Sequence, residues 1–163
     1  MTYQQLRNLL VLQLFQYLDG PRVVLSDQIM PESEYPYLYY QGVQLRIPGP
    51  FNVEHQAGAE RAQLRREQAQ ATFSFTACSR SEDEALELAE KAQGFFLWPG
   101  RKILAAHGVA VLEVQNVQGR SAFEIDETDR RYGFDLLVRY EYVESRPLEA
   151  MDAPPITYDK EDS

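Results

Sequence analysis

The strongest constraint on this fold is the alternation from Arg131 to Val143, which reads RYGFDLLVRYEYV. The apolar side of the alternation consists of Tyr132, Phe134, Leu136, Val138, Tyr140 and Tyr142. A period of two places these side chains on one face of an extended chain, so the pattern predicts a long β-strand. Burial of each large apolar side chain stabilises a fold by roughly 1.5–3 kcal/mol, so other elements must cover this face.

Length and composition limit what can provide that cover. A chain of 163 residues with 44% hydrophobic residues can form one domain with a core and an extension, but hardly two domains. The net charge of -9 disfavours general nucleic-acid binding, which needs a concentrated basic surface. The single cysteine, Cys78, excludes an internal disulfide and a cysteine-based zinc site. The apolar run LLVLQLFQYL is too short to cross a bilayer, so we expect a soluble protein made in the cytosol.

Two main helices are predicted. Thr2 and Gln5 have the spacing of a capping box, and leucines at helical spacing continue this helix to about Asp19. Ser81 and Glu84 repeat the capping pattern before the second helix. The apolar stripe of that helix consists of Ala85, Leu88, Ala89, Ala92, Phe95 and Phe96. Both helices therefore have an apolar side that can cover a sheet.

Three further strands are predicted at 37–47, 67–78 and 109–117, from alternation and from β-branched and aromatic residues. The order of elements predicts an α+β fold, with a mostly antiparallel four-stranded sheet packed on one face by the two helices. Residues 49–66 form an unusually long connection for a compact domain, and such connections are usually functional or disordered. We expect one domain over residues 1–143.

The C-terminal segment, residues 144–163, differs in composition from the domain. It carries six acidic residues against two basic ones, together with three prolines. Such a composition buries too little apolar surface to fold by itself, so we expect this segment to be extended or disordered in isolation.

Residues suited to catalysis or metal binding are scarce. His55 and His107 have no carboxylate or cysteine nearby at ligand spacing, so surface positions are favoured over a metal or catalytic role. Cys78 has no evident base beside it, which favours an inert thiol. The acidic run 124–129 lacks the glycine and the spaced oxygens of a calcium loop, and fits a solvated hairpin tip better. We expect no catalytic residue, no cofactor and no metal ligand.

The residues left for function are those suited to contacts with partners. Arg61, Arg65 and Arg66 form the one basic cluster. Glutamates flank it, so docking to an acidic protein surface is as credible as phosphate contact, and a solvated loop is favoured over both. The tyrosines of YPYLYYQ are expected to be exposed. The candidate interface residues are Tyr37, Tyr39, Phe51, Asn52, His55, Arg61, Arg65, Arg66 and Tyr158.

Residues 1–143 resemble the neck and tail terminator proteins of long-tailed bacteriophages. The resemblance rests on Tyr35-Pro36-Tyr37 before the first strand, on EQAQATFSFTAC followed by SEDEALELAEKAQGFF, and on RRYGFDLLVRYEYV as the final strand. It implies a structural virion protein without enzymatic activity, assembled in the host cytoplasm into a hexameric ring at the neck of the virion. The implied partners are the tail tube or sheath protein and the head-tail connector. DNA would pass through the ring without specific binding, and no membrane would be involved.

A ring of six copies would carry six times -9, or -54, so we expect some carboxylates to face the channel and repel DNA. Screening limits this repulsion to charges within about 8–10 Å. We further expect the 49–66 connection to grip the tail tube or sheath, and the acidic C-terminal segment to wrap a neighbour or the connector. Two alternatives stay open: an adaptor module outside phages with a similar fold, and a small enzyme that uses the open sheet face as a pocket.

Overall fold

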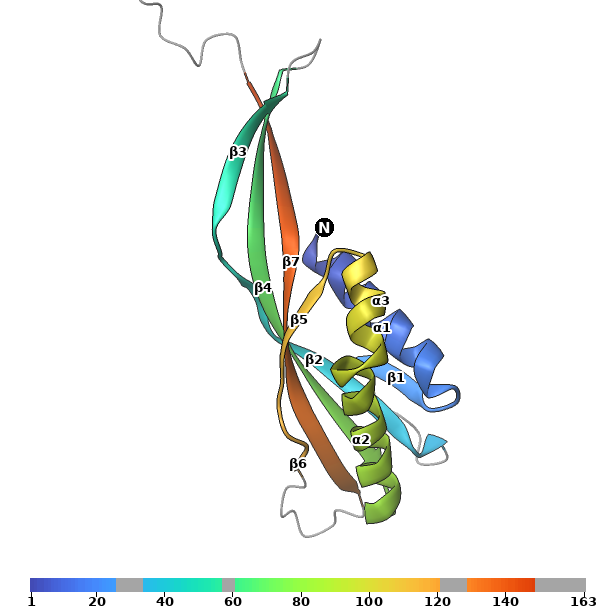
Figure 1. Cartoon of the computed structure of the whole chain (residues 1–163). Helices are drawn as coiled ribbons and strands as arrows, with labels where there is room; N and C mark the ends of the chain where they lie inside the picture. The colour runs from blue at the N-terminus through green and yellow to red at the C-terminus, as the bar shows by residue number, and fades with distance from the viewer. Residues whose placement is uncertain (26–33, 57–60, 121–128, 149–163) are drawn as a thin grey trace, which may run out of the picture.

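The computed structural model describes residues 1–25, 34–56, 61–120 and 129–148. In these ranges the chain forms helices α1 (Tyr3–Leu18), α2 (Glu82–Leu97) and α3 (Pro99–Ala106), and strands β1 (Arg22–Leu25), β2 (Tyr37–Ile47), β3 (Phe51–Gln56), β4 (Ala62–Ser79), β5 (Ala110–Val114), β6 (Gln118–Gly119) and β7 (Arg130–Pro147). The helices lie together on one side of the strands (Figure 1). The predicted α+β fold, with a largely antiparallel sheet covered by helices on its apolar face, is confirmed.

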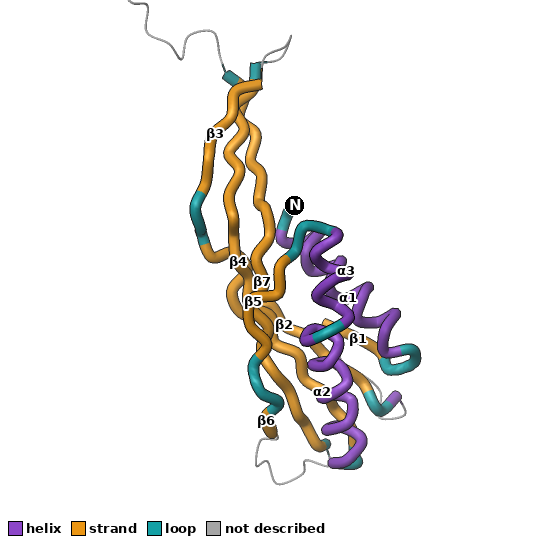
Figure 2. The backbone as a smooth tube through the Cα atoms, in the orientation of Figure 1, coloured by secondary structure: helices purple, strands orange, loops and turns teal. Residues whose placement is uncertain are grey.

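The described strands form one open, twisted sheet (Figure 2). Its order is β1-β2-β4-β7-β5, while β3 adds to β4 and β6 adds to β7. The pairings are antiparallel except that between β1 and β2, which is parallel. The four predicted strands correspond to β2, β4, β5 and β7, and sequence patterns missed β1, β3 and β6.

The two central strands, β4 and β7, pair along their whole length, from Ala62 opposite Pro147 to Ser79 opposite Arg130. The alternation that predicted β7 is confirmed, because Phe134, Leu136 and Val138 are fully buried. On β4 the buried positions of the same face are Ala69, Ala71, Phe73, Phe75 and Ala77. Aromatic rings stack at the centre of this core, where the centroids of Phe75 and Phe134 lie 5.6 Å apart.

The helices are built as their sequences indicate. Thr2 accepts a hydrogen bond from the Gln5 backbone and its own backbone N–H donates to the Gln5 side chain, which confirms the capping box. At the start of α2, the Ser81 hydroxyl accepts from the Glu84 N–H, which is half of the predicted box. The buried residues of α1 are Leu6, Leu10, Leu14 and Leu18. Those of α2 are the six predicted from its stripe.

The interpretation of 49–66 as a long connection is wrong. Residues 51–56 form strand β3 and β4 begins at Ala62, so the segment is mostly a β-hairpin. The predicted C-terminal segment 144–163 is paired within β7 as far as Pro147, and residues 149–163 lie outside the described residues. Most of the acidic run 124–129 also lies outside them.

Candidate interaction surface

A three-stranded arm extends the sheet beyond the helices (Figure 1). We define the arm as β3, residues 62–67 of β4 and residues 142–147 of β7. Every residue of β3 is exposed, including the large apolar side chains of Phe51 and Val53, which are 58% and 43% accessible. Strands that expose apolar side chains beside an open edge are unusual unless a partner covers them.

The junction between β2 and β3 keeps both strands on the same edge of β4. Pro48 and Pro50 interrupt the ladder because proline has no N–H to donate. The backbone carbonyl of Pro50 nevertheless accepts from the Gln68 N–H at 2.9 Å. Between the prolines, a Cβ on Gly49 would overlap the Gln68 carbonyl, so only glycine fits this close backbone approach.

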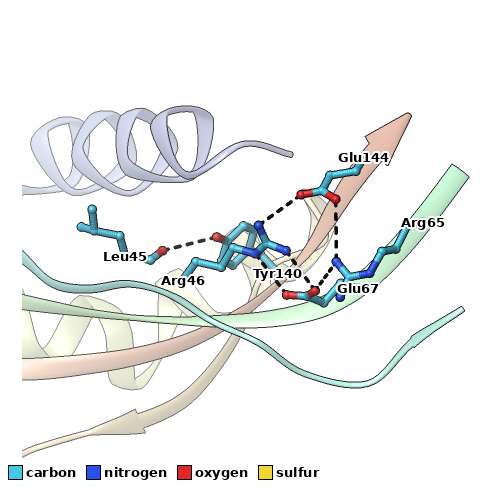
Figure 3. Close-up of polar contacts among 6 residues, drawn as sticks. All are labelled: Leu45, Arg46, Arg65, Glu67, Tyr140 and Glu144. Carbon is cyan, nitrogen blue, oxygen red and sulfur yellow. Dashed lines mark hydrogen bonds and ion pairs between the residues drawn. The ribbon is translucent and has the colours of Figure 1, made fainter. Parts of the chain in front are cut away.

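The face of the arm that continues the helix-covered side of the sheet carries a network of ion pairs (Figure 3). Arg46, at the end of β2, contacts both carboxylate oxygens of Glu67 at 3.1 and 3.2 Å, and Arg65 contacts Glu67 at 2.6 Å. Both arginines also reach Glu144 on β7, at 3.3 and 4.0 Å. This network ties β2, β4 and β7 together at the base of the arm.

Glu67 is the centre of this network. Its side chain has no solvent-accessible surface, although Arg46 and Arg65 above it are 31% and 29% accessible. The carboxylate is therefore covered by the two arginine side chains near the surface rather than by a deep core. Hydrogen bonds from Arg46 lower the pKa of Glu67, and Arg65 adds to this effect against the opposing effect of burial.

The aromatic side chains near the base of the arm support the same cations. The guanidinium of Arg46 lies 3.8 Å from the ring centroid of Tyr142, and that of Arg65 lies 4.2 Å from the ring centroid of Phe51. The Tyr140 hydroxyl donates to the backbone carbonyl of Leu45 at 3.4 Å (Figure 3). Stacking of this kind fixes the orientation of the guanidinium groups.

The opposite face of the arm, which the helices leave open, has its own network. Arg66 contacts Glu54 on β3 at 3.2 Å and Glu141 on β7 at 2.9 Å, so one side chain bridges three strands. A solvent-open hollow of about 420 Å³ lies beside it. The hollow is lined by Pro50, Phe51, Asn52, Glu54, Arg66, Gln68 and Glu141.

The structure gathers most of the candidate interface residues on the arm. Phe51, Asn52 and His55 lie on β3, and Arg65 and Arg66 lie on β4. Arg61 directly precedes β4, and its carbonyl accepts from the Leu148 N–H at 2.8 Å. The favoured interpretation of these arginines as a solvated loop is wrong for Arg65 and Arg66, which belong to a strand and form ion pairs.

The tyrosines lie elsewhere. Tyr37 and Tyr39 lie in the part of β2 distant from the arm, where they are half-buried rather than exposed as predicted. Burial, followed by a hydrogen bond with Cys78, raises the pKa of Tyr37. Tyr158 lies outside the described residues.

Sequence reasoning missed Arg46, Glu67, Glu141 and Glu144 as members of the arm's networks. One signal was present for Glu67, because it continues the series of inward positions that Ala69 and the following alternate residues of β4 occupy. A carboxylate in such a series indicates a nearby cation, since a buried charge must be paired.

The rest of the described surface exposes further large apolar side chains and holds few groups suited to catalysis or metal binding. The helical layer exposes Leu12, Phe15, Leu97, Trp98 and Ile103, with Trp98 84% accessible. No group of three or more His, Cys, Asp or Glu side chains in the described ranges is placed to hold a metal ion. Among the helices of those ranges, none combines the length and the apolar character needed to cross a membrane.

These features define a class of protein: an α+β chain with a helix-backed sheet, a projecting arm, and charged arm residues paired with one another. The sequence model of the phage neck terminator proteins matches residues 3–162, which is nearly the whole chain. The chain therefore belongs to the phage neck terminator protein family, and its role is structural, at the neck and tail end of the virion. No curated protein matches its sequence.

Proposed function

We propose that this protein forms a hexameric ring that terminates the phage tail and joins it to the head-tail connector, leaving a channel for DNA. Membership in the neck terminator family supports the terminating role. The single structural observation that carries the proposal is the arm, a three-stranded extension whose outer strand is exposed at every residue. In a ring, such an extension reaches beyond its own subunit to neighbouring copies or to the tail.

The distribution of charge is consistent with a channel that does not retain DNA. The described ranges hold 15 of the 16 basic residues and 14 of the 25 acidic ones, so they are nearly neutral. The net charge of -9 therefore comes from the four remaining segments of the sequence, which hold one basic and 11 acidic residues. We infer that some carboxylates of the chain face the channel of the ring and, repeated around it, repel the phosphates of passing DNA.

Shortening the arm tests the proposal. Asn52 lies opposite Arg66, and the alternation that follows from the Pro50–Gln68 hydrogen bond makes them a hydrogen-bonded pair, so replacement of residues 53–65 by Asn-Gly would connect the two through a two-residue β-turn. This variant keeps the helices and the Glu67 carboxylate. When it is the only form of this protein in an infected cell, the shortened variant should fold, and the tails should be uncapped or abnormal in length.

The control for folding is the circular dichroism and melting curve of the shortened chain beside the full chain. Electron micrographs then report tail length and the fraction of tails joined to heads. Capped tails of normal length, made by a folded shortened variant, would contradict a role for the arm in tail termination.

A further inference from the structure

The arm has two outer edges to which no strand is paired in the part of the chain that the structure describes. On β7, the outer edge is covered by β6 and β5, and then by the Met1 amine, which donates to the Glu141 carbonyl at 3.0 Å. Beyond Glu141, no described strand pairs with the outer edge of 142–147. The same holds, among the described strands, for the outer edge of β3 along 51–56.

The hydrogen bonds on either side show which backbone groups point outward. In an antiparallel strand, successive residues direct their N–H and C=O groups alternately to one neighbour and to the other. Pro50 accepts from Gln68 of β4, so the outward residues of β3 are Phe51, Val53 and His55. Glu141 accepts from Met1 on the outer side, so the next outward residues of β7 are Val143 and Ser145.

The two open edges also lie level with each other. Arg66 of β4 is opposite Asn52 on one side and Val143 on the other. One step further along, Leu64 is opposite Glu54 and Ser145. Both outer strands are antiparallel to β4, so β3 and β7 run in the same direction.

We propose that β3 of one copy pairs in parallel with β7 of the next copy, so that the arms form a continuous sheet around the ring. The inference rests on the proposed ring of copies. Rotation about an axis along the arm keeps every copy at the same height, which places Asn52 beside Val143 and Glu54 beside Ser145 of the neighbour. Side chains that share a face of one arm then share the same face of the joined sheet.

The backbone groups in this arrangement complement one another. In a parallel ladder, alternate residues of a strand direct both their N–H and their C=O toward the neighbouring strand. Each such residue forms hydrogen bonds with the two residues that flank its partner on that strand. Val143 would donate to the Phe51 carbonyl and accept from the Val53 N–H. Ser145 would donate to the Val53 carbonyl and accept from the His55 N–H. Each of these groups is one that the single copy leaves pointing outward.

A second copy of this chain fits these edges better than an unrelated strand does. The open edges of β3 and of residues 142–147 match each other in height, direction and length, and both belong to the same arm. A proline marks one end of each open edge, because Pro50 precedes β3 and Pro147 ends β7. Proline has no N–H and cannot donate a hydrogen bond to a ladder. Pairing would also bring the neighbouring strand against Phe51 and Val53, which are exposed in the single copy.

Disulfide cross-linking tests the register. The full chain with Asn52→Cys and Val143→Cys should give covalent oligomers up to the size of the ring under mild oxidation. Within one copy the two positions are separated by two strand spacings, roughly 10 Å, which is too far for a disulfide. The matched control carries Asn52→Cys and Glu144→Cys, which lie on opposite faces and should not cross-link. The native Cys78 is buried in this structure, far in sequence from the substituted positions.

Proline substitution tests the hydrogen bonds. Ser145→Pro removes an outward N–H to which none of the described strands is paired, and proline is tolerated in edge strands. Ser145→Ala keeps the N–H and serves as the control. We expect Ser145→Pro to weaken assembly by about tenfold per contact, as measured by light scattering. The circular dichroism spectrum and the melting temperature of the proline variant should equal those of the alanine variant.

Failure of this inference can be told apart from failure of the proposed function. Rings that form without the 52–143 cross-link, and that assemble equally well with proline or alanine at 145, would overturn the pairing and leave the ring intact. A cross-link to a tail protein in place of a second copy would also overturn it. A chain that never assembles, alone or on tail tubes, would contradict the ring itself and the pairing with it.

Discussion

Replacement of Glu67 by glutamine tests whether the ion-pair network holds the base of the arm. The change keeps the shape of the side chain but removes the charge that Arg46 and Arg65 contact at 2.6–3.2 Å. A hydrogen bond to a charged group contributes about 1.5–3 kcal/mol, and removal of one partner of a fully buried pair costs about 3–5 kcal/mol. Because both arginines are nearly a third exposed and can be rehydrated, we expect a loss of about 2 kcal/mol.

For a chain of this length, such a loss corresponds to a melting temperature lower by about 4–8 °C. The matched control is Glu87→Gln on the exposed side of α2, which removes the same charge and should change stability by less than about 0.5 kcal/mol. Differential scanning calorimetry at neutral pH measures all three proteins. Equal melting temperatures for wild type and Glu67→Gln would refute the reasoning.

The same pair of proteins gives a pH dependence with a definite sign. The pKa of Glu67 is lowered below its ordinary value of 4.5, so folding favours the charged form. The stability advantage of wild type over Glu67→Gln is therefore complete above about pH 4.5 and is lost as the pH falls through the lowered pKa. An advantage that grows on acidification would contradict the assignment of the charge.

Three further predictions concern the body of the protein. Leu10→Ala should cost about 2–5 kcal/mol because Leu10 is fully buried, whereas Leu12→Ala on the outer side of the same helix should cost less than about 1 kcal/mol, as measured by urea unfolding. Gly133→Ala would place a Cβ against the Phe75 carbonyl, so its melting temperature should fall well below that of wild type. Cys78 is fully buried and its pKa is raised by that burial, so a thiol reagent should modify it only after unfolding, and rapid labelling of the native chain would contradict its position.

The body of this fold could be predicted from the sequence because burial imposes periodicity on it. The alternation around Phe134 identifies β7, and the stripe around Leu88 identifies the buried side of α2. The limits of β2 were also predicted, since a run rich in tyrosine and branched residues ends there at a proline. In each case one side of the element packs against the core, so the apolar residues recur at the period of the element.

The arm could not be predicted in the same way. The sequence FNVEHQ of β3 is exposed on both faces, so burial imposes no alternation on it. Strand β3 forms because its backbone pairs with β4. Strand β4 is itself held in an extended conformation by its pairing with β7 and by the core. The ion pairs at the base of the arm join Arg46 and Glu144, which are far apart in sequence, and no local pattern predicts such a contact.

Electron microscopy of the purified protein mixed with isolated tail tubes tests the central claim most directly. The claim is that copies of this chain close into a ring at the end of the tail, with their arms in contact. The account predicts a six-fold ring of density at one end of each tube, and its loss when residues 53–65 are replaced by Asn-Gly. Bare tube ends with the full chain, or capped ends with the shortened one, would contradict it.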